Sequence, residues 1–177
     1  KQLKENGQDV GKVHLQSSYG AINYNTETYD YVRIGIIMYG VNSDNTAYQK
    51  NKLDLKPVLS LKARVTSVKE INKDDSVSYG RTYIADSNRK IASISIGYAD
   101  GIPRCLSDKN MLVKVNGNYS KVIGRICMDQ CVIDVTDVKE IKTGDVVYII
   151  DCDDINLSSE KFAMNADTIT NEFLSRL

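Results

Sequence analysis

Hydrophobic and polar residues alternate over much of the chain after residue 55. Leu59, Leu61, Ala63 and Val65 are each followed by a polar residue. A period of two is expected for a strand that buries one face and exposes the other. Residues 91–96, 131–135 and 145–150 are also read as strands, with Thr143-Gly144 as the turn before the last of them. The pattern therefore predicts a mainly antiparallel β-domain.

Two further signals complete this domain. Asn116-Gly117 separates the apolar stretches 111–115 and 118–126, which is the strongest short signal for a β-hairpin. Near the end, Ser158 or Ser159 can cap a helix that carries Glu160 in its first turn. We therefore expect a hairpin within the β-domain and one closing helix.

The first 54 residues have a different pattern. Val13-His14-Leu15 is read as a short buried strand, and residues 31–40 form a nearly continuous apolar run, typical of a strand in a parallel sheet with both faces covered. Arg33 interrupts that run, so it either reaches solvent at the strand end or meets a buried ligand. Residues 41–54 read as a linker. Two fold classes in one chain predict two domains, 1–54 and 55–177.

Composition narrows the class of protein. The 177 residues carry 23 basic and 23 acidic side chains, so no net charge draws the chain to nucleic acid or to anionic lipid. No apolar run approaches the roughly 18 residues of a membrane span, and the opening residues are not expected to act as a signal peptide. A cytoplasmic location is expected. The start reads like the middle of a domain, so a membrane anchor in a preceding segment stays open.

Neither the cysteines nor the acidic turn matches the pattern of a metal site. Cys127 and Cys131 have no second pair at zinc-ligand spacing, which favours buried, reduced thiols. Residues 151–156 are acidic, but Asn156 occupies the position at which a calcium loop requires glycine. This segment is read as an ordinary acidic turn.

Tyr79 is the first candidate for chemistry. It lies in Val77-Ser78-Tyr79-Gly80, after a turn-forming run, with little apolar sequence around it. From the residues alone it is either an ordinary loop aromatic or a phenol free to meet a ligand.

Three strings decide between these readings: Val77-Ser78-Tyr79-Gly80, Ile96-Gly97-Tyr98-Ala99-Asp100-Gly101 and Gly124-Arg125-Ile126-Cys127-Met128-Asp129-Gln130. In this order they resemble the C-terminal domain of alanine racemases. Residues 32–40 are similar to the last barrel strand of that family, so the resemblance covers about residues 14–172.

The resemblance implies a fold and a cofactor. Residues 1–54 would be the last strand–helix units of a (β/α)8 TIM barrel that binds pyridoxal 5'-phosphate, followed by the β-domain, in a head-to-tail homodimer. The cofactor phosphate would meet the Ser18 hydroxyl and the N–H groups of Gly35 and Ile36. Ser17 stands where family members usually carry asparagine, which weakens that contact. Arg33 would hydrogen-bond the cofactor's pyridine nitrogen.

The implied reaction exchanges the α-proton of a small amino acid between two bases, one on each face. By resemblance Tyr79 is one base, supplied to the partner subunit's site. The other is a Schiff-base lysine, which cannot be placed in this chain, so the segment alone should not racemise amino acids. Met128 would offer its N–H to the substrate carboxylate, and Tyr98, Arg104 and Arg125 would line the path by which substrate arrives.

Substrate choice depends on Asn171, which replaces the tyrosine of the family's Thr-Ile-x-Tyr-Glu string. A short amide leaves room for a hydroxyl and can hydrogen-bond it. This favours a serine racemase that also accepts alanine, as in the D-serine branch associated with vancomycin resistance, making D-amino acid for cell-wall precursors. The alternatives are a strict alanine racemase, with Asn171 a neutral variant, or a non-catalytic β-barrel that binds a protein partner. A nucleic-acid-binding barrel is disfavoured because the net charge is zero.

Overall fold

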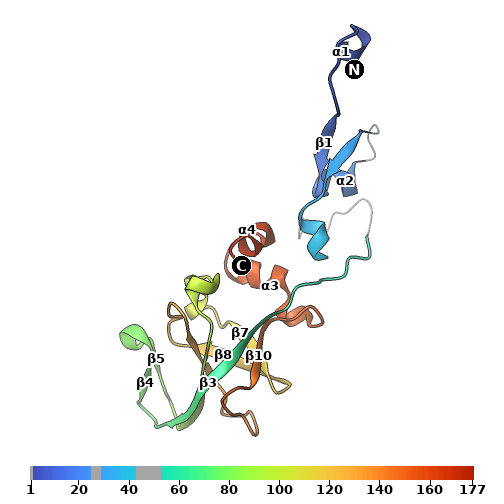
Figure 1. Ribbon diagram of the computed structural model, residues 1–177. Coiled ribbons are helices and arrows are strands. Elements are labelled where there is room, and N and C mark those ends of the chain that lie inside the picture. The colour runs from blue at the N-terminus through green and yellow to red at the C-terminus, as the bar shows by residue number, and fades with distance from the viewer. Residues whose placement is uncertain (1, 25–28, 43–52) are drawn as a thin grey trace. The chain divides into compact units, whose positions relative to one another are not determined.

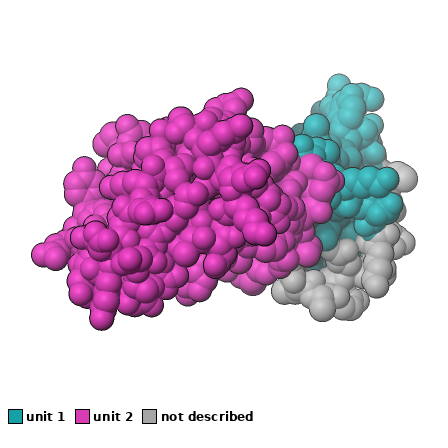
Figure 2. Space-filling model, turned by 90° about the horizontal axis from the view of Figure 1, so that it is seen from below, with its two compact units in different colours: residues 1–58 teal, residues 59–177 magenta. Residues whose placement is uncertain are grey.

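The computed structural model describes residues 2–24, 29–42 and 53–177 (Figure 1). It divides into two compact units, Lys1–Val58 and Leu59–Leu177, coloured separately in Figure 2. Most of the predicted linker lies outside the described residues. In the part of the chain that is described, no helix is both long enough and apolar enough to cross a bilayer.

The first unit contains a small parallel sheet. Strand β1 pairs in parallel with β2, and α2 follows β1 directly in the chain. A parallel pair needs a crossover between its strands, and α2 is described within that crossover. The elements are α1 (Gln2–Glu5), β1 (His14–Ser17), α2 (Ser18–Asn23), β2 (Tyr31–Arg33) and the 3₁₀ helix η1 (Ile36–Tyr39).

The apolar run 31–40 does not form one strand. Strand β2 ends at Arg33, and after Gly35 the chain turns into η1, which buries Ile36 and exposes Met38. The prediction of one long strand over residues 31–40 was therefore wrong. A short apolar run does not distinguish a strand from a tight helical turn.

The second unit is built on a closed six-stranded antiparallel barrel in the order β10-β3-β6-β9-β8-β7, with β7 pairing back to β10. The mainly antiparallel fold class is confirmed. The strands are β3 (Leu61–Ile71), β6 (Arg89–Ile94), β7 (Leu112–Val115), β8 (Asn118–Ile123), β9 (Cys131–Asp134) and β10 (Val146–Ile150).

The hairpin at Asn116-Gly117 forms as its sequence indicates. Strands β7 and β8 pair from Val115 opposite Asn118, and both turn residues have positive φ, 47° and 77°. Two positive φ values give the turn the twist that suits adjacent antiparallel strands.

Two short helices rather than one complete the barrel's apolar core. Helix α3 (Ser159–Asn165) begins at Ser158, whose hydroxyl accepts a hydrogen bond from the Lys161 N–H. Helix α4 (Thr170–Leu174) follows it in the chain and lies beside it in Figure 1. Phe162 and Phe173 pack with their ring centroids 4.6 Å apart, in the same core as the barrel strands.

A second hairpin, which the sequence pattern did not predict, projects from the barrel in Figure 1. It consists of β4 (Ser76–Val77) and β5 (Tyr83–Ile84), joined through the 3₁₀ turn η2 (Tyr79–Arg81). Its Val77 belongs to a small apolar cluster with Ile91 and Ile123, distinct from the barrel core. The hairpin is thus fixed to the barrel wall by its own packing. Two further 3₁₀ turns follow β6, η3 (Tyr98–Asp100) and η4 (Arg104–Asp108).

Candidate active site

Tyr79 is held at the tip of the β4–β5 hairpin. The side chain is 72% exposed, although Val77, two residues before it, is buried. Gly80 has φ 72°, which lets the chain reverse directly after the phenol. The phenol therefore points away from the apolar cluster that anchors the hairpin.

The segment that contains Tyr98 is clamped to the segment that contains Met128. The Tyr98 N–H donates to the Cys127 carbonyl at 2.9 Å, and the Ala99 N–H donates to the Met128 carbonyl at 2.8 Å. The Asp100 carboxylate accepts from the Gly97 N–H at 2.9 Å and holds the start of η3. Tyr98 and Met128 keep exposed side chains, so backbone contacts order two side chains that remain free to meet a ligand.

Arg125 joins the third string to the first. A Cβ atom placed on Gly80 would lie 2.9 Å from the Arg125 Nη1, so the guanidinium rests against the backbone beside Tyr79. A hollow of about 380 Å³ opens next to this contact, lined by residues of the first and third strings and of the adjoining strands: Ser78, Tyr79, Ser93, Cys127, Gln130, Cys131 and Val132. The three strings, far apart in sequence, thus meet in one place.

Arg104 shares a different hollow with Tyr98. It is exposed on η4 and, with Tyr98, Pro103 and Arg176, lines a second hollow of about 420 Å³. The structure therefore brings together Tyr79, Tyr98, Arg125 and Met128, and joins Arg104 to that group through Tyr98.

The cysteines near the site differ in character. Cys131 is 1% exposed, and its burial raises the pKa of the thiol to about 12, which keeps it neutral. Cys127 is half-buried and lines the same hollow as Tyr79. All four cysteines are free thiols.

The predicted phosphate-binding residues lie together in the first unit. The Gly35 N–H donates to the Ser18 Oγ at 3.0 Å, and Ile36 begins η1 directly after it. A Cβ atom on Gly35 would meet nothing within 4 Å, so there is open space beside these groups. A hydroxyl and backbone N–H groups beside open space suit a phosphate. The residues present therefore fit the group.

Arg33 reaches solvent in the described structure. Its side chain is exposed and donates from Nη2 to the Leu15 carbonyl at 3.0 Å, across the β1–β2 pair. Asn171 belongs to the second unit, where it is exposed on the first turn of α4.

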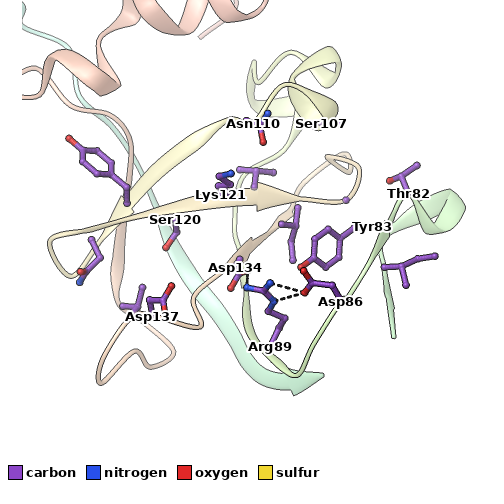
Figure 3. Close-up of a pocket in the computed structure, with 17 residues that line it drawn as sticks. Thr82, Tyr83, Asp86, Arg89, Ser107, Asn110, Ser120, Lys121, Asp134 and Asp137 are labelled. Carbon is purple, nitrogen blue, oxygen red and sulfur yellow. Dashed lines mark hydrogen bonds and ion pairs between the residues drawn. The ribbon is translucent and has the colours of Figure 1, made fainter. Parts of the chain in front are cut away.

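A further cavity contains none of the predicted site residues. It measures about 810 Å³ and is lined by residues of β5, β8 and β9 and of the adjoining loops (Figure 3). Arg89 there is paired with Asp86 at 2.7 Å and with Asp134 at 3.3 Å. Burial, and then the nearby Asp134 charge, raise the pKa of Tyr83. Arg89 is thus already ion-paired with two carboxylates, so size alone does not make this cavity the reactive site.

Comparison with known proteins extends the resemblance. Residues 58–177 match the family described as "Alanine racemase, C-terminal domain". An alanine racemase from Clostridium perfringens is 47% identical over 151 residues, which cover 85% of this chain and 38% of the relative. An amino-acid racemase from Enterococcus faecalis is 39% identical over 175 residues, 99% of this chain and 24% of the relative.

This chain belongs to the alanine racemase family. Solved structures agree: the alanine racemase of Clostridium difficile 630, in complex with cycloserine, has a TM-score of 0.89 and 31% identity over 99% of this chain and 45% of its own. That of Bartonella henselae, which holds covalently bound pyridoxal phosphate, has a TM-score of 0.82 and 31% identity, covering 98% and 46%. The chain thus spans less than half the length of these family members.

The sequence predicted site residues within the three strings. It did not predict a role for Ser78 or for the glycines that allow backbone segments to lie close together. A Cβ atom on Gly97 would lie 2.4 Å from the Cys127 and Met128 carbonyl oxygens. A glycine in each string was the available signal, because glycine permits backbone segments to touch.

Proposed function

We propose that this chain is the C-terminal part of a pyridoxal-phosphate-dependent racemase of small amino acids, in which Tyr79 is the base on one face of the substrate. One observation carries the proposal: an exposed phenol is held on an anchored hairpin, beside Arg125 and the Met128 segment. The family membership and the cofactor held by the Bartonella henselae neighbour support it.

Racemisation requires one base on each face of the α-carbon, because the proton leaves one side and returns on the other. Pyridoxal phosphate, when bound, supplies the electron sink for the reaction. The Tyr79 oxygen would accept or return the proton on its face. The second base would be a lysine of the complete enzyme, outside the residues that resemble the family here.

The chain's own groups would hold the cofactor and the substrate. Ser18 and the N–H groups of Gly35 and Ile36 would bind the phosphate. Arg33 would donate to the pyridine nitrogen, and a guanidinium does not readily give up a proton, so that nitrogen would stay unprotonated. The Met128 N–H would bind the substrate carboxylate, while Arg104, Arg125 and Tyr98 would line the approach.

Tyr79 would act in the site of a second copy of the protein. Its side chain is 72% exposed and borders an open hollow on the barrel surface, where a second copy could reach it. A homodimer with composite sites follows, in which Tyr79 of one subunit meets the cofactor held by Arg33 of the other.

Mixing two inactive variants of the complete enzyme tests this arrangement. Tyr79→Phe removes the base and Arg33→Ala removes the donor to the cofactor, so each homodimer should lose nearly all racemisation, measured by chiral chromatography. After unfolding and refolding together, about a quarter of the sites should be intact, since half of the dimers are mixed and each mixed dimer has one unaltered site.

No recovery on mixing would contradict a composite site. Full activity of Tyr79→Phe alone would contradict the role of Tyr79, and with it the proposed reaction. Circular dichroism of each variant serves as the control for folding.

We further propose that serine is the preferred substrate and alanine a second one, with the D-amino acid used in cell-wall precursors as in vancomycin resistance. Asn171 carries this step, because an amide can hydrogen-bond the serine hydroxyl whereas the family's tyrosine fills that space. The relative from Enterococcus faecalis, called an amino-acid racemase, fits a broader choice than alanine alone.

Replacing Asn171 with tyrosine should move the preference towards alanine. The ratio of kcat/KM for serine to that for alanine should fall by about 10-fold, the effect of losing one hydrogen bond of about 1.4 kcal/mol to the substrate. Asn165→Tyr, at the end of the neighbouring helix α3, is the control and should leave the ratio unchanged. An unchanged ratio in Asn171→Tyr would instead favour a strict alanine racemase.

A further inference from the structure

Ser78, which directly precedes Tyr79, has a strained backbone. Its φ is 65° and its ψ is −178°, a conformation that residues other than glycine rarely adopt. Such strain costs on the order of 1–3 kcal/mol and persists only where surrounding contacts enforce it. Something in the fold therefore holds Ser78 in place.

The Ser78 hydroxyl supplies one such contact. It donates to the Arg125 carbonyl at 2.6 Å and lies 3.7 Å from the Cys127 Sγ. The residue is half-buried, so this hydrogen bond is partly shielded from water. It ties the turn that carries Tyr79 to the segment that carries Met128.

Gly124 makes the approach possible. It has φ 66°, and a Cβ atom there would lie 2.8 Å from the Ser78 Cβ and 2.9 Å from the Val77 carbonyl oxygen. The two segments therefore touch at backbone distance, and the hydroxyl fastens them where they touch.

We propose that Ser78 is a positioning residue, whose hydrogen bond to the Arg125 carbonyl fixes the Tyr79 phenol relative to the Met128 N–H. This inference rests on the proposed function, because it matters only if Tyr79 transfers the proton. Two residues, Ile126 and Cys127, separate the bonded Arg125 carbonyl from Met128, and the Met128 carbonyl is itself held by the Ala99 N–H. One hydrogen bond thus sets the spacing between the base and the group that would bind the substrate carboxylate.

Ser78→Ala removes the donor and keeps the backbone of an L-residue. A displacement of the reacting group by about 1 Å can slow a reaction by roughly 100-fold. We expect kcat to fall by about 10- to 100-fold while KM changes by less than about 3-fold, because the groups that bind the substrate are untouched.

Isotope effects distinguish positioning from a general loss of folded enzyme. The complete holoenzyme is assayed with α-deuterated L- and D-substrate. If Ser78→Ala slows only the steps at Tyr79, the isotope effect on kcat/KM rises for the enantiomer whose α-hydrogen Tyr79 removes and falls for the other. A loss of folded molecules lowers both rates and leaves both isotope effects as they are.

Two further variants make the test decisive. Ser158→Ala removes the cap of α3, a comparable hydroxyl contact far from Tyr79 in sequence, and should leave the isotope effects unchanged. Ser78→Gly also lacks the hydroxyl, but glycine adopts a positive φ without strain. It should therefore resemble Ser78→Ala in kinetics and unfold at a higher temperature than Ser78→Ala.

Wild-type isotope effects in Ser78→Ala would overturn the positioning role. Wild-type isotope effects in Ser78→Gly would also overturn it, because backbone strain rather than the lost hydroxyl would then explain the kinetics of Ser78→Ala. Tyr79→Phe, assayed alongside, distinguishes failure of the positioning role from failure of the proposed function. If Tyr79→Phe is inactive while Ser78→Ala is normal, only the positioning role fails. If Tyr79→Phe is fully active, the proposed function fails.

Discussion

At the scale of single residues, small side chains set the distances within the candidate site. Gly97 lies so close to the third string that an added Cβ would be 2.4 Å from two carbonyl oxygens. Its φ of −150° is extended and open to any residue, so glycine is required there by space alone. Gly117 is the opposite case, with φ 77° and nothing within 4 Å of an added Cβ.

Gly97→Ala should therefore destabilise the protein by about 3 kcal/mol, because the new methyl group meets backbone that cannot move aside. Gly117→Ala, the matched control, should cost only about 1 kcal/mol, from its positive φ. Urea unfolding of both variants measures the difference. Equal losses would show that the loop at residues 127–128 yields to the methyl group.

The sequence predicted several residues of the candidate site but not all of the contacts between them. The strings pointed to Tyr79, Tyr98, Arg125 and Met128, and the structure brings these residues together. The Ser78 contact could not be predicted, because serine carries no signal for positive φ and its hydrogen bond spans 47 positions.

At the scale of elements, alternation was informative where strands were long enough to show a period. It indicated residues 59–66 and 145–150, which overlap β3 and β10. Strands β4 and β5 have two residues each, too few for any period to appear, although they carry the candidate base between them. Their position depends on contacts with Ile91 and Ile123 that are distant in sequence.

A polar link between elements offers a pH-dependent test. The Tyr119 hydroxyl on β8 donates to Asp154 before η5 (Ile155–Leu157) at 2.7 Å, and Lys114 lies 3.0 Å from the same carboxylate. The Tyr119 hydrogen bond, followed by that of Lys114, lowers the pKa of Asp154 below its usual 3.8. This contribution to stability is present above the unfolded-state pKa and is lost as pH falls through the lower, folded-state pKa.

Tyr119→Phe should therefore be less stable than wild type at pH 7, and the gap should narrow as pH falls below about 4. Unfolding by urea across this range measures the gap. Tyr148→Phe, which removes a hydroxyl on β10, is the control and should show no such narrowing. A gap that stays constant with pH would mean that Tyr119 contributes through packing rather than through Asp154.

At the scale of the whole molecule, the barrel core and the hairpin cluster are separate. The barrel interior and the two C-terminal helices share one set of buried residues, and the base-bearing hairpin packs on a smaller second set. Composition and periodicity indicated a mainly antiparallel domain, which is confirmed, but closure depends on β7 meeting β10. Partners that lie about 30 residues apart leave no local trace in the sequence.

Closure of the barrel also governs how further copies can attach. Each of its six strands, all within the described residues, has a neighbour on both sides along part of its length, so none of them is an edge strand that is unpaired from end to end. Another chain would therefore contact the barrel mainly through side chains and loop tips. Closure thus leaves only short stretches, such as residues 67–71 of β3, where a foreign strand could pair with the barrel backbone.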